Sequence, residues 1–167
     1  MGHLVITIGC EYGAKGNAIG RKIAEGLGIK FYDRELVDQI IEEVGIPKDI
    51  MNRVEEGGTI AGKAGSASAT TGYVPGSATV EDLLASVPER AIHVQKQIIR
   101  KLAEKEACVI IGRSADYILK DSKDIKLLRA FIYAPDEIRI QNIMKSHSLS
   151  ESDAKILLLE KDKRYHK

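Results

Sequence analysis

A glycine-rich segment with a single lysine, residues 9–17, holds the residue types that most directly imply chemistry. It follows the phosphate-binding pattern G-x-x-x-x-G-K-[ST], with Gly9 at the start, Lys15 at the lysine position and Ala14 in place of the second glycine. A polyphosphate needs converging backbone N–H groups, a helix N-terminus and an ammonium group, and this order of residues can supply all three. The segment therefore predicts a phosphate-binding loop, with contacts from Gly9, Gly13, Ala14, Lys15, Gly16 and Asn17.

Departures from the pattern leave two other interpretations open. Gly16 stands where a serine or threonine normally binds Mg²⁺, and Asn17 follows it, so the usual hydroxyl ligand is missing. An ordinary strand, turn and helix with a solvated lysine would give the same segment. A dinucleotide-binding fold would place an acid near Asp33, but the glycines do not follow G-x-G-x-x-G. The spacing favours the phosphate-binding loop.

Further basic residues could surround a transferred phosphoryl group, which is mainly what phosphoryl transfer asks of a protein. Arg113 directly follows an apolar run, so it is expected at the carboxyl edge of a sheet, where ligands of α/β proteins bind. Arg139 lies one turn into an expected helix, and Lys161 and Arg164 belong to a basic cluster near the end of the chain. Each could instead be a solvated charge or pair with a nearby acid. Their occurrence together with the loop favours a kinase site.

The elements that must position these residues alternate along the chain. Apolar, β-branched runs predict strands, and amphipathic patterns between them predict helices, so we expect a parallel α/β sheet with right-handed crossovers. Gly28 is expected to end the first helix, and Asp33 and Ser150 are expected to cap later ones. The expected strands are 4–8, 29–32, 107–111 and one within 125–134, and the expected helices are 15–27, 34–44, 81–104 with a break near Pro88, 136–146 and 151–164.

Composition predicts one domain over residues 1–167, because the chain is 44% hydrophobic and nothing suggests a second core. Residues from about 52 to 79 are rich in Gly, Ala, Ser and Thr and have too little apolar surface to offset their ordering entropy. They are expected to form a flexible insert, as a long loop, an adaptable lid or a disordered segment.

Charge and the rarer residues narrow the possible partners and the location. A net charge of +1 gives no global basic field, so neither a nucleic acid nor a membrane is expected as a partner. The two cysteines are expected to be reduced thiols, and the four histidines are not spaced to hold a metal, so no protein-held metal site is expected. The N-terminus does not resemble a signal peptide and no stretch suits a membrane span, which predicts a cytoplasmic protein.

Several motifs of this chain resemble the cytidylate kinase-like proteins of bacteria, which are relatives of cytidylate kinase among the P-loop nucleoside monophosphate kinases. The resemblance covers the chain except the segment rich in Gly, Ser and Thr, and many relatives lack the loop lysine that is present here. The motif at 110–119, IIGRSADYIL, is the most specific, and the others lie at 6–9, 11–13, 19–20, 31–33, 130–135 with Arg139, and 162–163.

The resemblance implies a Rossmann-like P-loop NTPase fold, in which helices flank a five-stranded parallel sheet and a helical lid spans about 139–167. The sequence ends at Lys167, before the final strand of such a fold, so that last strand is expected to be missing from this chain. The resemblance also implies ATP with Mg²⁺ at the loop and an acceptor held by Asp33, Arg113 and Asp116. It places Arg139, Lys161 and Arg164 on the lid.

These expectations combine into an ATP-dependent kinase whose partners are small-molecule nucleotides. Its acceptor would be a nucleoside monophosphate, CMP or dCMP, although the base stays open because the cytosine-reading segment cannot be aligned. An acceptor phosphate is already ionised at neutral pH, so no strong general base is needed. The alternative is a nucleotide-binding protein that serves regulation or assembly without kinase turnover, which the missing loop hydroxyl and the lack of a clear Mg²⁺-binding acid favour.

Overall fold

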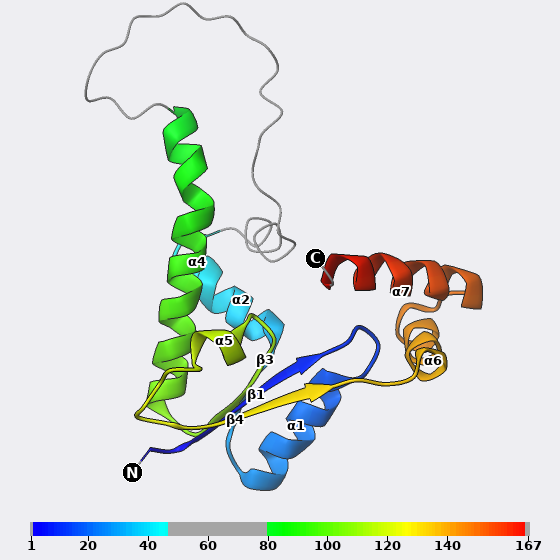
Figure 1. Ribbon diagram of the computed structural model, residues 1–167, viewed down its shortest axis with the longest axis horizontal. Helices are drawn as coiled ribbons and strands as arrows, with labels where there is room; N and C mark the ends of the chain where they lie inside the picture. Colours follow the sequence, from blue (N-terminus) through cyan, green and yellow to red (C-terminus); the bar gives the residue numbers. More distant parts are fainter. Residues whose placement is uncertain (1, 47–79, 166–167) are drawn as a thin grey trace, which may run out of the picture.

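A four-stranded parallel sheet forms the centre of the computed structural model (Figure 1). The structure describes residues 2–46 and 80–165, and for 80–89 and 164–165 the backbone alone. Its strand order is β2-β3-β1-β4, so β3 and β1 are the inner strands. The expected insert at 52–79 lies outside the described residues. The strands are β1 (Leu4–Cys10), β2 (Lys30–Tyr32), β3 (Cys108–Ile111) and β4 (Lys126–Ile132).

The register of the sheet brings the carboxyl ends of the inner strands together. Ile8 of β1 pairs with Ile111 of β3 on one side and with Ala130 of β4 on the other. Both inner strands are continuous apolar runs because helices cover both faces of the sheet. Residues that directly follow β1 and β3 therefore share one edge of the sheet.

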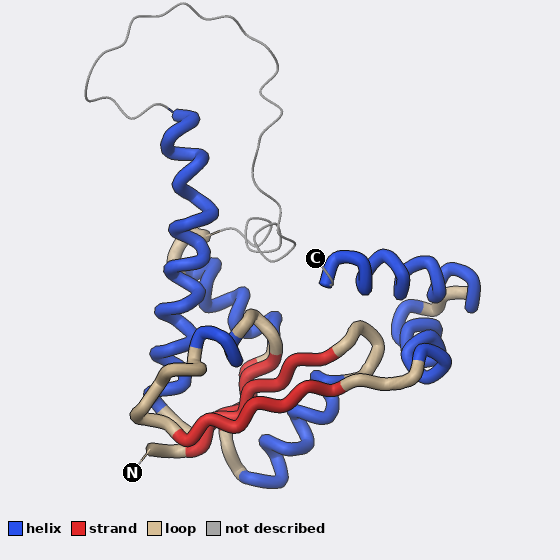
Figure 2. Tube along the Cα trace, viewed as in Figure 1, coloured by secondary structure: helices blue, strands red, loops and turns tan. Residues whose placement is uncertain are grey.

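The helices form a layer on each face of the sheet and a separate pair beyond its carboxyl edge (Figures 1 and 2). Helix α1 (Gly16–Leu27) packs on the face that shows Ile6 and Ile8. The other face is covered by α2 (Arg34–Glu43), α4 (Val80–Lys105) and α5 (Ala115–Ile118). Helices α6 (Asp136–His147) and α7 (Glu151–Tyr165) follow β4 and share a small core of Ile143, Ala154 and Leu158.

Most expected elements are confirmed, including their caps. Asp33 accepts a hydrogen bond from the backbone N–H of Leu36 at 2.9 Å, Gly28 ends α1 in the left-handed conformation, and Ser150 accepts from the N–H of Asp153 at 3.2 Å. The pair of α6 and α7 occupies the region where the helical lid was expected. Within residues 2–46 and 80–165, no helix is both long and apolar enough to cross a membrane.

One expectation about the elements is corrected, and one short helix was not expected. The break near Pro88 is absent, and α4 continues from Val80 to Lys105. A proline removes only one backbone hydrogen bond of the helix, and the many that remain in a helix of 26 residues outweigh it. The four-residue helix α5 was not expected, since it is too short to show a periodic pattern. The resemblance implied a five-stranded sheet whose last strand is missing from this chain, and the sheet of the described residues has four strands.

Candidate functional site

Backbone strain gathers at the carboxyl edge of the two inner strands. Among the described residues, four that are not glycine have a positive φ, and three of them follow β1 or β3: Lys15 at 61°, Arg113 at 55° and Ser114 at 52°. A left-handed conformation costs an L-residue about 1–2 kcal/mol. Such strain persists where surrounding structure enforces it, and it concentrates at functional sites. This edge is therefore the candidate site.

The loop after β1 presents an open helix N-terminus. Its turn is closed by the N–H of Ala14, which donates to the carbonyl of Glu11 at 3.1 Å. Lys15 is the N-cap of α1, its side chain is exposed, and that side chain makes no capping hydrogen bond. The first turn of α1 also contains no acidic residue. The positive end of the helix dipole thus lies beside an exposed ammonium group, as an anion site requires.

Two glycines let this loop pack closely. A Cβ at Gly16 would lie 2.5 Å from Sγ of Cys10, and a Cβ at Gly13, where φ is 83°, would lie 2.9 Å from the carbonyl oxygen of Arg139. Burial raises the pKa of the Cys10 thiol, and a hydrogen bond from the backbone of Gly16 partly offsets this. Asn17 is exposed in the first turn of α1, and Gly9 lies in β1 against Phe131. The backbone of the loop is therefore held close to β1 and α6, while Asn17 and Lys15 remain exposed.

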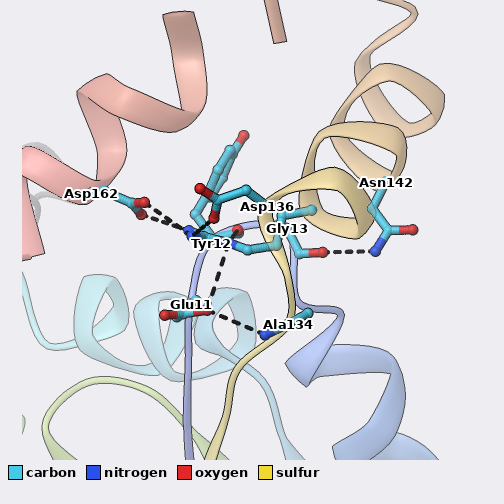
Figure 3. Close-up of polar contacts among 8 residues, drawn as sticks. Glu11, Tyr12, Gly13, Ala134, Asp136, Asn142 and Asp162 are labelled. Carbon is cyan, nitrogen blue, oxygen red and sulfur yellow. Dashed lines mark hydrogen bonds and ion pairs between the residues drawn. The ribbon is translucent and has the colours of Figure 1, made fainter. Parts of the chain in front are cut away.

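The guanidinium of Arg139 is buried beside the loop. Figure 3 labels the residues that engage it, among them Tyr12, Asp136 and Asp162. Its Nε donates to the carbonyl oxygen of Tyr12 at 2.8 Å. Its Nη1 donates to Asp136 at 3.1 Å, and Nη1 and Nη2 donate to the two carboxylate oxygens of Asp162 at 3.0 and 2.6 Å. Glu11 lies 3.7 Å from Nε. The hydrogen bond and charge of Asp162 come first among the causes that raise the pKa of Arg139, so this group is a fixed cation.

The other lid residues lie on α7. Nζ of Lys161 stands 5.7 Å from the centre of the Tyr12 ring, which is within the range of a cation–π contact. Lys161 is therefore next to the loop that follows β1. Arg164 lies in the last turn of α7, and its side chain is among those left out.

Arg113 lies at the expected edge, but its side chain does not face solvent. It is wholly buried and forms an ion pair with Asp38 of α2. Its backbone carbonyl accepts a hydrogen bond from Nε2 of Gln95 at 2.9 Å. A buried charge needs a partner of opposite sign, and Asp38 supplies it from the helix that covers this face of the sheet.

The remaining predicted acceptor residues, Asp33 and Asp116, lie near the ends of neighbouring strands. Asp33 follows β2, caps α2 and lies 3.4 Å from Nη2 of Arg21. Asp116 is exposed in the first turn of α5, just after β3. In residues 2–46 and 80–165, no three His, Cys, Asp or Glu residues gather in a way that could hold a metal ion.

The sequence interpretation missed Asp38, Asn142 and Asp162 as partners of the site. Asp38 had a usable signal, because it lies on the apolar face of α2 beside Val37 and Ile41, where an acid is rarely left without a partner. Asn142 donates to the carbonyl of Gly13 at 2.8 Å. Nothing in its sequence neighbourhood indicates this contact.

Several solved structures have a fold similar to that of this chain. An uncharacterised protein from Eubacterium ventriosum is 25% identical, with a TM-score of 0.62 over 96% of this chain and 71% of its own. Shikimate kinase from Bacteroides thetaiotaomicron has a TM-score of 0.50 at 17% identity, over 97% of this chain and 79% of its own. TT1252 from Thermus thermophilus has a TM-score of 0.50 at 15% identity, over 98% of this chain and 80% of its own. The expected α/β P-loop NTPase fold is thereby confirmed.

Sequence comparison finds no match among curated proteins. The model of the cytidylate kinase-like family, in contrast, matches residues 5–167, which is nearly the whole chain. This confirms the resemblance seen in the motifs. The chain belongs to the cytidylate kinase-like family.

Proposed function

We propose that this protein transfers a phosphoryl group from ATP to a nucleoside monophosphate, with CMP or dCMP as the acceptor. Membership of a kinase-like family supports nucleotide chemistry of this type. The observation that carries the proposal is the loop after β1, where an exposed lysine in a strained conformation stands at an uncapped helix N-terminus. A protein has little reason to keep lysine there unless a ligand uses its charge.

The donor would bind along the loop, held by its backbone N–H groups and by Lys15. ATP would bring Mg²⁺ with it and supply the γ-phosphoryl group, since Gly16 stands where a metal-binding hydroxyl is usual and the loop offers none of its own. Lys161 stands close enough to Tyr12 to add positive charge beside the loop. Arg139 and Arg164 are the other lid cations that we assign to the transferring group, although Asp162 holds Arg139 in the described structure.

The acceptor would bind beyond β2 and β3, which are neighbours in the sheet. Asp33 and Asp116 would contact its sugar or base, and Arg113 would contact its phosphate. The Arg113 side chain is buried against Asp38, so acceptor binding requires a movement that uncovers it. A guanidinium has five donors in a planar fork and can hold Asp38 and a phosphate at the same time.

A second candidate function is nucleotide binding without turnover, in a regulatory or assembly role. Carboxylates already engage two of the cations assigned to phosphate groups, because Arg113 pairs with Asp38 and Arg139 with Asp162. Gly16 in place of a hydroxyl residue also favours this alternative.

Turnover with a panel of monophosphates separates the two functions. The purified chain is mixed with ATP and Mg²⁺ and with CMP, dCMP, UMP, AMP or GMP, and formation of the diphosphate is followed by chromatography. We expect CMP or dCMP to be converted faster than the others. Binding of ATP without conversion of any monophosphate would support the regulatory role instead.

A further inference from the structure

Helix α6 holds two successive carbonyl groups of the phosphate-binding loop. Arg139 donates from Nε to the carbonyl of Tyr12, and Asn142 donates from Nδ2 to the carbonyl of Gly13, each at 2.8 Å (Figure 3). These two side chains are three residues apart and lie on the same face of α6. In a trans peptide the C=O and N–H groups point in opposite directions, so fixing the Tyr12 carbonyl turns the N–H of Gly13 away from α6.

Arg139 cannot hold this position alone, because its guanidinium would be a buried charge without a partner. Asp162 of α7 binds it through both carboxylate oxygens, and Asp136 of α6 binds it through one. Arg139 is 3% exposed, whereas the Asp162 side chain is 30% exposed. A chain of contacts therefore runs from α7 through Asp162 and Arg139 to the backbone of the loop.

The ring of Tyr12 adds a second link between the loop and the helical pair. Its hydroxyl lies 2.9 Å from Nε2 of His147 at the end of α6, and the ring packs against the core shared by α6 and α7. Lys161, one residue before Asp162, stands over the same ring. The loop thus contacts the helical pair through both its backbone and its side chain.

We propose that Asp162 is a positioning residue for nucleotide binding: by orienting Arg139 it fixes the loop in the conformation that receives the phosphates, and it couples that conformation to the position of α7. The inference rests on the proposed function in taking ATP as the ligand of the loop. It assigns a role to a residue that touches neither nucleotide. A substitution that removes the charge of Asp162 should therefore weaken binding of the donor nucleotide and leave binding of the acceptor unchanged.

Calorimetric titration of three variants beside the unmodified chain tests this. The probes are a non-hydrolysable ATP analogue with Mg²⁺ and, separately, CMP, and thermal unfolding is recorded for each variant. Asp162→Asn keeps the size of the side chain but removes its charge, and Asp162→Glu keeps the charge. Lys155→Gln is the matched control, since it removes an exposed ion pair with Glu151 on the same helix.

We expect Asp162→Asn to weaken binding of the analogue roughly 3- to 30-fold, the range of coupling through a supporting residue. Its affinity for CMP should not change, Asp162→Glu should restore most of the loss, and Lys155→Gln should bind as the unmodified chain does. A purely structural role would lower the unfolding temperature without separating the analogue from CMP.

The outcomes distinguish this inference from the function on which it rests. Equal or tighter binding of the analogue by Asp162→Asn, with tight binding by the unmodified chain, would overturn the positioning role alone. An unmodified chain that does not bind the analogue would overturn the proposed function, and this inference with it. An equal loss for the analogue and for CMP would assign Asp162 to general stability.

Discussion

The loops after β1 and β3 share a strained backbone conformation at a basic residue, but they differ in whether that residue is exposed. Each follows an inner strand of the sheet, and each holds a basic residue in the left-handed conformation, Lys15 in one and Arg113 in the other. The Lys15 side chain is exposed, whereas that of Arg113 is wholly buried against Asp38. The same backbone strain thus accompanies an exposed cation at the proposed donor site and a buried, paired cation at the proposed acceptor site.

The difference follows from what each neighbouring helix supplies. Helix α1 brings no acid in its first turn, so the charge of Lys15 adds to the positive end of the helix dipole. Helix α2 places Asp38 on its buried face, where it neutralises Arg113. Strain at a buried, paired residue therefore does not by itself indicate a ligand contact, whereas strain at an exposed charged residue is best explained by one.

The largest effect is expected when the acid that pairs with the buried Arg113 is removed. Asp38→Ala would leave Arg113 buried without its carboxylate and should lower the free energy of unfolding by about 3–5 kcal/mol. Denaturation in urea measures this, with Glu42→Ala as the control at an exposed position of the same helix. A loss no greater than that of the control would show that the pair does not stabilise the fold.

A smaller effect is expected when the shape of the buried cation is changed. Arg113→Lys keeps the charge, but an ammonium cannot hold Asp38 and a phosphate in the same way. The value of kcat/KM for the monophosphate should therefore fall by a factor that corresponds to a loss of about 1.5–3 kcal/mol of transition-state stabilisation. Steady-state kinetics should show that the KM for the monophosphate rises more than the KM for ATP. If both constants keep their values in an active enzyme, Arg113 does not contact the acceptor.

Alkaline pH should lower the free energy of unfolding through a buried thiol of β3. Burial, followed by the charge of Glu106, raises the pKa of the Cys108 thiol from its ordinary value of 9.0 to about 12. The unfolded chain then loses this proton at lower pH than the folded one, so stability falls as pH rises from about 9 towards 12. Cys108→Ala should show a shallower decline in denaturation experiments over this range. An unchanged slope would mean that the thiol does not contribute.

The sequence predicted the fold well because the strands and caps are local features. The apolar runs that became β1 and β3 are continuous and β-branched, and Asp33 caps its helix through a contact three residues away. Gly28 ends α1 for a similarly local reason. The expectation failed at Pro88, where propensity indicated a break and α4 continues.

The site was predicted less completely because its contacts join distant segments. The position of Lys15 followed from the motif, but the pairing of Arg139 with Asp162 spans two helices, and that of Arg113 with Asp38 spans two layers of the fold. Periodicity places a residue on a face of an element and cannot name the residue opposite. The residues that pair with the buried charges could therefore be identified only from the structure.

One substitution tests the central claim, that Lys15 keeps a strained conformation because the donor phosphates use its charge. Lys15→Gly should stabilise the fold by about 1–2 kcal/mol, because glycine adopts the left-handed conformation without strain. The greater freedom of glycine in the unfolded chain should offset about 0.5–1 kcal/mol of this gain. The variant should therefore be more stable in urea, yet bind the ATP analogue about 1.5–3 kcal/mol more weakly in calorimetry. Undiminished affinity for the analogue in the stabilised variant would contradict the claim.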